Sequence, residues 1–441
     1  MNNDQKDRQD NCISIQDNGV SGFKIMRLNV FRFLVILCFV MIATQSLAQN
    51  SIARQKAISL VSEGDNHLRL GGWQNALISY TNAIQTDPEY AVAYMKRGQL
   101  NERILRTNEA ERDYNQAIYL NPLIDIFYDQ RARLRILSFD YYGAVEDITM
   151  AINMNGNNVN YLKHQVDGFI AAGMYERALE NLDSGEFSSS DLVYKLQRKG
   201  LVHLLNGDIP LAEKQVEEAY ELDQTNYLTL DLLGLILLSK EDYTTALVWF
   251  NEAIASDSTQ SISFYNRGVC YRFLDETDLA LQDMNKSIEL NNQQQAAFFK
   301  RALIRKEQGD LQGSIVDYKE AISLDSAYED AIYNRSFTYK ILGDFLNAEK
   351  DIDYLINTSE NRPEYWNMKG NLQVLHGDIE GSLDSYNTAI SLKYDYSDAF
   401  YNRGIAYLLL NRTTRACGDF QQSVDMGNSK AEEIILNFCG F

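Results

Sequence analysis

The sequence predicts an all-α fold assembled from repeated helix pairs. Three observations carry this prediction: a 34-residue periodicity through most of the chain, apolar places at helical spacing within each period, and only 4 prolines among 441 residues. Proline interrupts helices because it lacks an amide donor and clashes with the preceding turn, so its scarcity favours continuous helix. A chain of this length also exceeds what one hydrophobic core usually serves, and a repeat array avoids that limit.

The composition is acidic. Lys and Arg total 41 against 61 Asp and Glu, which gives a formal charge of −20. Binding to a phosphate backbone depends on cations that release counterions, so this balance argues against a nucleic-acid partner. We interpret the charge as a solvated surface that keeps a long array soluble, with a basic protein partner as the alternative.

Residues 1–48 show the pattern of an N-terminal extension followed by an export signal. An unbroken apolar run extends from Phe33 to Ala43 after several basic residues, and the small-residue site at 46–48 follows it. This layout is typical of a secretory signal peptide, and the run is shorter than the roughly 20 residues that span a bilayer. We therefore expect an exported protein of the bacterial periplasm or cell envelope, cut after Ala48. The alternative is an inner-membrane anchor at residues 30–43, and membrane contact is expected only through such an uncleaved segment.

Eleven units of 34 residues follow a short lead-in at 49–56, and no insertion interrupts them. Their boundaries are 57–90, 91–124, 125–158, 159–192, 193–226, 227–260, 261–294, 295–328, 329–362, 363–396 and 397–430. Within each unit, places 4 and 24 are large and apolar, while place 20 is always small and place 8 is small in ten units. Places 4 and 8 share a face of one helix, and places 20 and 24 share a face of a second. The small places would let two antiparallel helices approach closely.

Turns are predicted between the two helices of a unit. Gly-Asp pairs mark them at 207–208, 309–310, 343–344 and 377–378. Glycine accepts positive φ where a helix ends, and aspartate can cap the start of the next helix. This pattern resembles the tetratricopeptide-repeat family over residues 57–430. The resemblance implies an α-solenoid wound as a right-handed superhelix, whose first helices line a concave groove. Residues 431–441 are expected to form a capping helix over the last apolar face.

A coupled pair of charged residues recurs inside the units. Place 7 is Arg and place 23 is Asp in the same six units, and the other five units have neither. The pairs are Arg97 with Asp113, Arg131 with Asp147, Arg267 with Asp283, Arg301 with Asp317, Arg335 with Asp351, and Arg403 with Asp419. Because the two places lie symmetrically about the predicted turn, we expect charge-assisted contacts that fix the helix geometry. The alternative is shared descent by duplication, which would keep both residues without contact.

A candidate binding groove is predicted at places 5, 9 and 12 of units seven to nine. These places combine apolar side chains with a row of cations: Tyr265, Val269, Arg272, Phe299, Leu303, Lys306, Tyr333, Phe337 and Lys340, with Tyr401 continuing the apolar part in unit eleven. In an acidic protein this pattern favours an extended acidic or carboxylate-bearing segment as ligand. The alternative is that long cationic side chains solubilise an apolar groove. The Lys and Asn set with which some family members clamp a C-terminal carboxylate is not matched.

Unit four departs from the repeat pattern. Gly185 stands where alanine packs in other units, and residues 186–191 replace the end of its second helix. Serine and glycine weaken a helix, so this segment is a candidate hinge, with sequence drift as the alternative.

Two cysteines near the C-terminus are candidates for a disulfide. Cys417 lies in the second helix of unit eleven and Cys439 in the expected capping helix, nearly symmetric about the turn between them. A disulfide is the favoured interpretation, with two buried thiols as the alternative.

No pattern in the sequence indicates catalysis. The 4 histidines fall at unrelated places of distant units, so no metal site, catalytic triad or cofactor is expected. The resemblance therefore implies a non-catalytic scaffold that holds a partner protein or peptide in the groove. A structural spacer or self-assembling element is the alternative, followed by an enzyme that uses groove residues directly.

Overall fold

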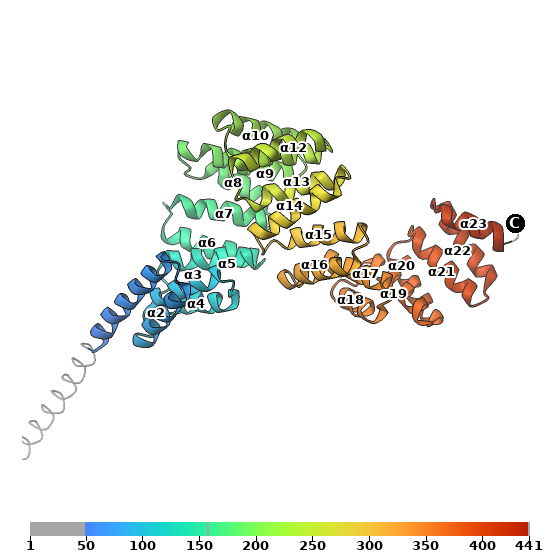
Figure 1. Cartoon of the computed structure of the whole chain (residues 1–441), viewed down its shortest axis with the longest axis horizontal. Helices are drawn as coiled ribbons and strands as arrows, with labels where there is room; N and C mark the ends of the chain where they lie inside the picture. The colour runs from blue at the N-terminus through green and yellow to red at the C-terminus, as the bar shows by residue number, and fades with distance from the viewer. Residues whose placement is uncertain (1–48, 157, 440–441) are drawn as a thin grey trace, which may run out of the picture. The chain divides into compact units, whose positions relative to one another are not determined.

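The computed structural model describes residues 49–156 and 158–439, and every regular element in them is a helix (Figure 1). These residues contain no strand, so the all-α prediction is confirmed. The export signal predicted in residues 1–48 lies outside the described residues. So do the last two residues of the expected cap, at 440–441.

The helices keep the 34-residue interval of the sequence. Residues 49–69 form the leading helix, so the expected lead-in is part of it. The later first helices are α3 (Ala91–Arg103), α5 (Asp125–Leu137), α7 (Val159–Ala171), α9 (Leu192–Leu205), α11 (Tyr227–Ser239), α13 (Ser261–Phe273), α15 (Gln295–Glu307), α17 (Glu329–Ile341), α19 (Pro363–His376) and α21 (Ser397–Leu409). The second helices are α2 (Trp73–Thr86), α4 (Thr107–Leu120), α6 (Tyr141–Met154), α8 (Tyr175–Ser184), α10 (Ile209–Leu222), α12 (Tyr243–Ser256), α14 (Thr277–Leu290), α16 (Leu311–Leu324), α18 (Phe345–Thr358), α20 (Ile379–Leu392) and α22 (Thr413–Asp425). Every second helix begins at place 17 of its unit.

The turn between the two helices has one backbone conformation throughout. Place 15 has positive φ in all eleven units, and this place is glycine in six of them. The other five hold Leu105, Phe139, Glu241, Asp275 and Asn411 at φ between 56° and 63°. In the four predicted Gly-Asp turns, the aspartate side chain accepts a hydrogen bond from the backbone N–H three residues ahead, so the predicted caps are confirmed. The repeat therefore imposes the left-handed conformation even on residues that adopt it at a cost.

The chain divides into two compact bodies within unit four. We call residues 49–188 the N-terminal body and residues 189–439 the C-terminal body. At the division α8 has only 10 residues, Gly185 is extended, and the short 3-10 helix η1 (Ser189–Asp191) precedes α9. This is the segment for which the sequence predicts a hinge.

A glycine lets the two helices of a unit approach closely. In five units a ring at place 24 lies against a glycine at place 8: Gly64 with Tyr80, Gly98 with Tyr114, Gly234 with Phe250, Gly370 with Tyr386, and Gly404 with Phe420. A Cβ added at any of these glycines would lie 2.5–2.8 Å from the ring, far inside van der Waals contact. The five rings are at most 1% exposed. The absent Cβ therefore leaves the space that the ring fills.

The side chain at place 24 is smaller in most units where place 8 carries a Cβ. Where place 8 carries a Cβ in units three, four and nine, place 24 is a branched aliphatic residue: Ala132 with Ile148, Val166 with Leu182, and Ser336 with Ile352. Unit eight is the exception, since Ala302 stands opposite Tyr318. The buried hydroxyl of Tyr318 meets no hydrogen-bond partner among the described residues. A ring at place 24 and a Cβ at place 8 therefore compete for the same space. In unit eight, which has both, the buried Tyr318 hydroxyl is left without a hydrogen bond among the described residues.

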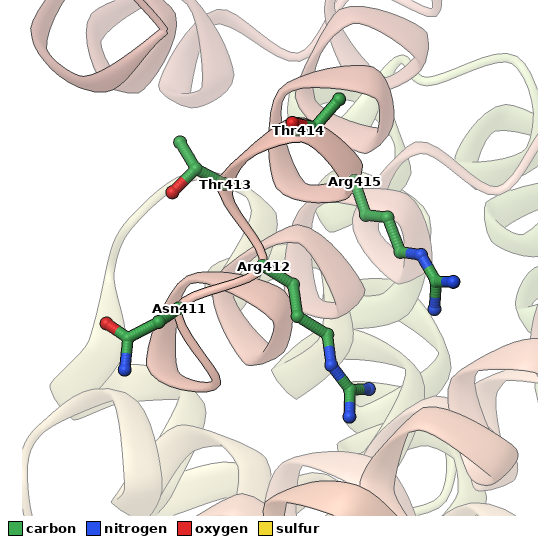
Figure 2. A pocket seen from close by; sticks show the side chains of 5 residues that line it. All are labelled: Asn411, Arg412, Thr413, Thr414 and Arg415. Carbon is green, nitrogen blue, oxygen red and sulfur yellow. The ribbon is translucent and has the colours of Figure 1, made fainter.

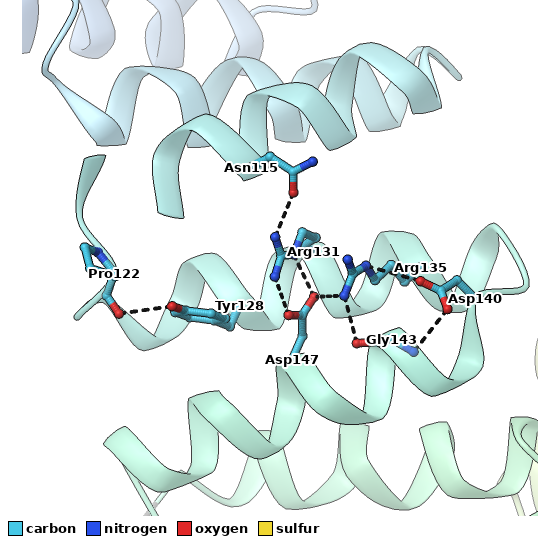
Figure 3. A network of polar contacts seen from close by, with 8 residues as sticks. All are labelled: Asn115, Pro122, Tyr128, Arg131, Arg135, Asp140, Gly143 and Asp147. Carbon is cyan, nitrogen blue, oxygen red and sulfur yellow. Dashed lines mark hydrogen bonds and ion pairs between the residues drawn. The ribbon is translucent and has the colours of Figure 1, made fainter. Parts of the chain in front are cut away.

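Each arginine at place 7 binds the aspartate at place 23 of its own unit. In all six units the Nε and Nη2 atoms of the arginine donate to the two carboxylate oxygens over 2.5–2.9 Å. The aspartates are between 1% and 8% exposed. In units three and eight a second arginine, at place 11, donates to the same carboxylate; Figure 3 shows Arg131 and Arg135 of α5 converging on Asp147 of α6. Two parallel hydrogen bonds fix the relative position of the helices.

The same arginines also bind the preceding unit, a contact that the sequence did not predict. Where place 25 of the preceding unit is asparagine, the Nη1 atom donates to it over 2.6–2.8 Å: Arg131 to Asn115, Arg267 to Asn251, Arg301 to Asn285, and Arg403 to Asn387. Lys369 binds Asp353 at the equivalent places, 2.9 Å apart. The recurring asparagine was visible in the sequence but lies outside the unit it supports. One row of side chains therefore joins helices within a unit and units to each other.

A short helix covers the end of the last unit. α23 (Ser429–Phe438) buries Ala431 completely against Ala416 and Phe420. It begins two residues before the predicted boundary because Asn428 caps it, accepting a hydrogen bond from the backbone of Lys430. A disulfide joins Cys417 of α22 to Cys439, directly after α23, and this bond ties the cap to unit eleven.

Candidate functional site

The first helices lie on the inner side of each body. Among the described helices, the substantial contacts that skip one helix join first helices to one another, such as α3 with α5 in the N-terminal body and α19 with α21 in the C-terminal body. In a curved stack of helix pairs, neighbouring units come closest on the inner side of the curve. Because the first helices of neighbouring units are in contact, they form the concave side. The predicted groove at places 5, 9 and 12 of the C-terminal body belongs to this side.

The aromatic residues at place 5 are packed against neighbouring rings. Phe299 is 8% exposed, and its ring centroid lies 5.1 Å from that of Tyr328, the last residue of the same unit, which is the N-cap residue of α17. Tyr333 lies 5.6 Å from Tyr365 of the next unit, measured between ring centroids. The other apolar residues of the predicted groove are partly buried against core residues of their own and the next unit: Tyr265, Val269 and Leu303. Tyr401 packs against Phe420 of its own unit. These side chains therefore serve mainly the packing of the array.

The three cations at place 12 differ in their partners. Arg272 binds Glu307 through two contacts, one of them from Nε to Oε2 at 3.2 Å. Lys306 donates from Nζ to Oδ1 of Asn334 at 2.9 Å. Lys340 has neither a carboxylate nor a hydrogen-bond acceptor within reach among the described residues. The row of cations therefore ends on an unpaired ammonium group.

Lys306 and Lys340 share one aromatic ring. Their Nζ atoms lie 5.5 Å and 4.5 Å from the centroid of the Phe337 ring. Burial lowers the pKa of both lysines, and for Lys306 it outweighs the carboxylate of Glu307 nearby. The face of the ring attracts each cation, but it supplies no negative charge. This part of the groove is consequently a site of partly desolvated positive charge.

A cavity of about 470 Å³ opens beside Lys340. Its lining combines apolar side chains with two asparagine amides and comes from five consecutive helices, α17 to α21: Lys340, Phe345, Asn371, Val374, Leu375, Tyr386, Asn402 and Ile405. The hydroxyl of Tyr386 donates to Oδ1 of Asn371 at 2.9 Å, and Nδ2 of Asn402 donates to Oδ1 of Asn367 at 3.0 Å. The sequence predicted Lys340 as a groove residue but neither asparagine. Asn371 is the one asparagine at place 9 of the eleven units, whereas Asn402 repeats Asn266 and Asn334 at place 6, a signal that could have found it.

The N-terminal body has a smaller and more polar hollow. It measures about 230 Å³ and lies between the leading helix, α3 and α5. Several of its polar groups bind one another: Lys96 lies 3.2 Å from a carboxylate oxygen of Asp65, and Nε2 of Gln99 donates to Oε1 of Gln130 at 2.9 Å. This hollow therefore lacks the apolar wall of the cavity beside Lys340.

A third hollow lies outside the groove. Figure 2 shows it at the turn from α21 to α22, lined by five consecutive residues, Asn411 to Arg415, around about 650 Å³. Arg412 already binds the carboxylate of Glu380, with Nη1 donating to Oε2 at 3.1 Å. Because one turn supplies the whole lining, the hollow has no opposing wall that could hold a ligand.

The described residues contain no group of three or more His, Cys, Asp and Glu residues arranged to hold a metal ion. The closest histidine–carboxylate contact that we find joins Nδ1 of His164 to Oδ1 of Asp129 at 2.6 Å. Cys270 is a buried free thiol, and burial raises its pKa to about 12, which keeps it protonated. None of the described helices combines the length and apolar character that crossing a bilayer requires.

Asp231, at place 5 of α11, is a buried carboxylate whose ionisation costs stability. It is 2% exposed, and burial raises its pKa to about 6. The hydroxyl of Ser263 donates to Oδ2 at 2.6 Å and partly opposes this rise, while Oδ1 has no hydrogen-bond partner among the described residues. In the unfolded chain an aspartate ionises near pH 4. The folded state is therefore favoured most below that pH and loses stability as the pH rises through about 6.

We expect the Asp231→Asn variant to lose this pH dependence. Between pH 4 and pH 7 the wild-type chain should lose ~2 kcal/mol of unfolding free energy through this one group, and the variant should not. Urea unfolding of both chains across this range measures the difference. Asp242→Asn is the matched control, because hydrogen bonds from Thr245 lower the pKa of that exposed aspartate. Parallel profiles for wild type and Asp231→Asn would contradict the expectation.

Comparisons with known proteins agree with this architecture. Tetratricopeptide-repeat family models match residues 262–294, 370–411 and 398–425. The RNA polymerase II-associated protein 3 of Xenopus laevis is 29% identical over 108 residues, which are 24% of this chain. The match spans only 16% of that relative's length.

Solved structures show a similar fold. The Cut9–Hcn1 hetero-tetramer of the APC/C matches with a TM-score of 0.51 and 12% identity, over 87% of this chain and 84% of the matched chain. A tetratricopeptide repeat protein from Parabacteroides merdae ATCC 43184 is 21% identical over 56% of this chain and 98% of its own, with a TM-score of 0.43. At such identities the first likeness supports the paired-helix fold and nothing about the ligand.

Proposed function

We propose that this chain, a tetratricopeptide-repeat protein, is a non-catalytic scaffold that holds an extended segment of a partner protein on the concave side of its C-terminal body. Tetratricopeptide-repeat domains bind protein or peptide partners. The observation that carries the proposal is the cavity beside Lys340, which first helices of three consecutive units help to line. A surface built from several units suits a segment that crosses them in turn.

Polar contacts around the cavity support a rigid surface. Arg–Asp pairs join the two helices of units nine and eleven. Unit ten is tied to its neighbours by Lys369 with Asp353 and by Arg403 with Asn387. A preorganised groove loses little conformational entropy on binding, so side-chain anchors convert more of their contact energy into affinity. No step of this mechanism requires a cofactor.

We further propose that the scaffold works in the bacterial cell envelope. The apolar run at 33–43 and the small residues at 46–48 support export. The disulfide between Cys417 and Cys439 is consistent with an oxidising compartment, where such bonds persist.

A photo-crosslinking experiment tests the proposal. p-Benzoylphenylalanine is placed at Leu375 in the cavity or at Val316 on a second helix, side chains that are 50% and 56% exposed. In cells that naturally contain the protein, we expect a discrete adduct with another protein from position 375 and none from position 316. Mass spectrometry of the adduct identifies the partner protein. The cell fraction that contains the adduct identifies the compartment.

The other outcomes contradict the proposal in separate ways. Equal adducts from both positions would place binding outside the groove. Adducts only between copies of this chain would favour a spacer or self-assembling element. Adducts confined to the cytoplasm, formed by a chain that retains residues 1–48, would contradict the envelope location.

A further inference from the structure

The geometry points to a defined ligand chemistry for the cavity beside Lys340. We infer that it takes an apolar side chain of the partner segment, and that Lys340 binds the carboxylate of an Asp or Glu adjacent to that side chain. This inference rests on the proposed function, since it names what the groove recognises. Three observations support it: the charge, the shape of the lining, and the free amide groups.

The charge around Lys340 is uncompensated. The cavity lining contains no carboxylate, although the chain has 61 acidic residues against 41 basic ones. Glu307 is the acidic group that acts on Lys306, and Arg272 already binds it. Burial lowers the pKa of Lys340, and no charged neighbour opposes that effect among the described residues. A carboxylate from a partner would offset this desolvation cost, which favours an anionic group at this position.

The wall of the cavity is apolar. Phe345, Val374, Leu375 and Ile405 face it, and Leu375 is 50% exposed. A volume of about 470 Å³ is enough for one branched aliphatic side chain with its backbone. Covering this wall removes apolar surface from water, so a leucine-sized side chain would add affinity that a charge alone does not supply.

The two asparagine amides match a peptide group. Asn371 uses its Oδ1 to accept from Tyr386, which leaves its Nδ2 donor without a partner among the described residues. Asn402 uses its Nδ2 to donate to Asn367, which leaves its Oδ1 acceptor similarly available. One free donor and one free acceptor pair with the C=O and N–H of a continuing backbone. A chain terminus would offer a carboxylate in place of that pair, so we assign an internal acidic side chain.

Four synthetic peptides test this chemistry on the full chain. The main probe is acetyl-Gly-Glu-Leu-Glu-Gly-amide, which places a carboxylate on both sides of one leucine. Its controls are the same peptide with Gln for both Glu, the same peptide with Gly for Leu, and acetyl-Gly-Gln-Leu with a free terminal carboxylate. Binding is followed by the NMR shift of the Ile405 δ1-methyl group, a cavity residue, assigned with an Ile405→Val variant.

We expect the main probe to bind about tenfold more tightly than its Gln counterpart, as one charge-assisted hydrogen bond allows. Lys340→Met should abolish that difference between the Glu and Gln peptides. Lys319→Met, which removes an exposed cation of a second helix, should change neither affinity. A thermal unfolding curve of each variant, matching that of the wild type, shows that folding is not the cause.

Several outcomes would overturn the inference. Equal binding of the Glu and Gln peptides, or no shift of the Ile405 methyl signal with any peptide, would show that the cavity does not recognise a carboxylate. Binding of the free-terminus peptide alone would show a terminal carboxylate as ligand. If Lys319→Met lost the preference for the Glu peptide as fully as Lys340→Met, the preference would come from non-specific attraction between charges. In each of these cases the crosslink from position 375 still decides the proposed function independently.

Discussion

Replacing Asp317 with alanine is expected to cost about 3–5 kcal/mol of local stability in units seven to nine, the range measured when one partner of a buried ion pair is removed. Asp317 is 1% exposed and accepts from both Arg301 and Arg305. Its loss would leave the guanidinium group of Arg301 without a counter-charge and that of Arg305 with only Asp310, 3.9 Å away. Hydrogen exchange of α15 and α16 measures the effect directly, because a repeat array can open locally without unfolding as a whole.

A matched surface change and a double variant separate the ion pair from a general charge effect. Asp384→Ala removes an exposed aspartate of α20 and should alter protection by less than about 0.5 kcal/mol. The double variant Arg301→Met with Asp317→Leu should recover part of the loss, because it leaves neither charge of that pair buried alone. A cost for Asp317→Ala as small as that of Asp384→Ala would show that the recurring pairs reflect shared descent without an energetic role.

The Gly370→Ala variant is expected to destabilise unit ten by about 2–3 kcal/mol, a cost typical of overpacking a well-packed core. The added Cβ would lie 2.5 Å from a ring carbon of Tyr386. That ring is 1% exposed, and its hydroxyl is held by Asn371, so it has little room to move. The midpoint of urea unfolding and the hydrogen exchange of α19 and α20 measure the loss.

The chain itself supplies the control and the rescue for this variant. Gly418 lies in the middle of helix α22 with no atom near its absent side chain, so Gly418→Ala should stabilise by up to about 1 kcal/mol. Units three and nine combine a Cβ at place 8 with isoleucine at place 24. Adding Tyr386→Ile to Gly370→Ala should therefore restore most of the stability. A double variant no better than the single one would show that the ring is not the source of the clash.

The sequence alone was sufficient for the repeat and its register. Every turn falls at place 15 and every second helix begins at place 17, because helix periodicity, small residues and turn chemistry are local signals that eleven copies reinforce. The arginines and aspartates could be paired in advance for the same reason. They lie sixteen residues apart in one hairpin, so the fold of a single unit fixes their distance.

Only the tertiary structure decided which groove residues are available. Phe299 and Tyr333 looked like exposed anchors, but Phe299 packs against Tyr328 at the end of its own unit, and Tyr333 packs against Tyr365 of the next unit. Arg272, Lys306 and Lys340 looked equivalent in the repeat, yet Glu307 and Asn334 pair with the first two and leave the third unpaired. The partner of a groove residue stands on the next first helix, about one repeat away in the chain. Its identity and its rotamer vary from unit to unit, and a repeating pattern cannot show which charge stays without a counter-charge.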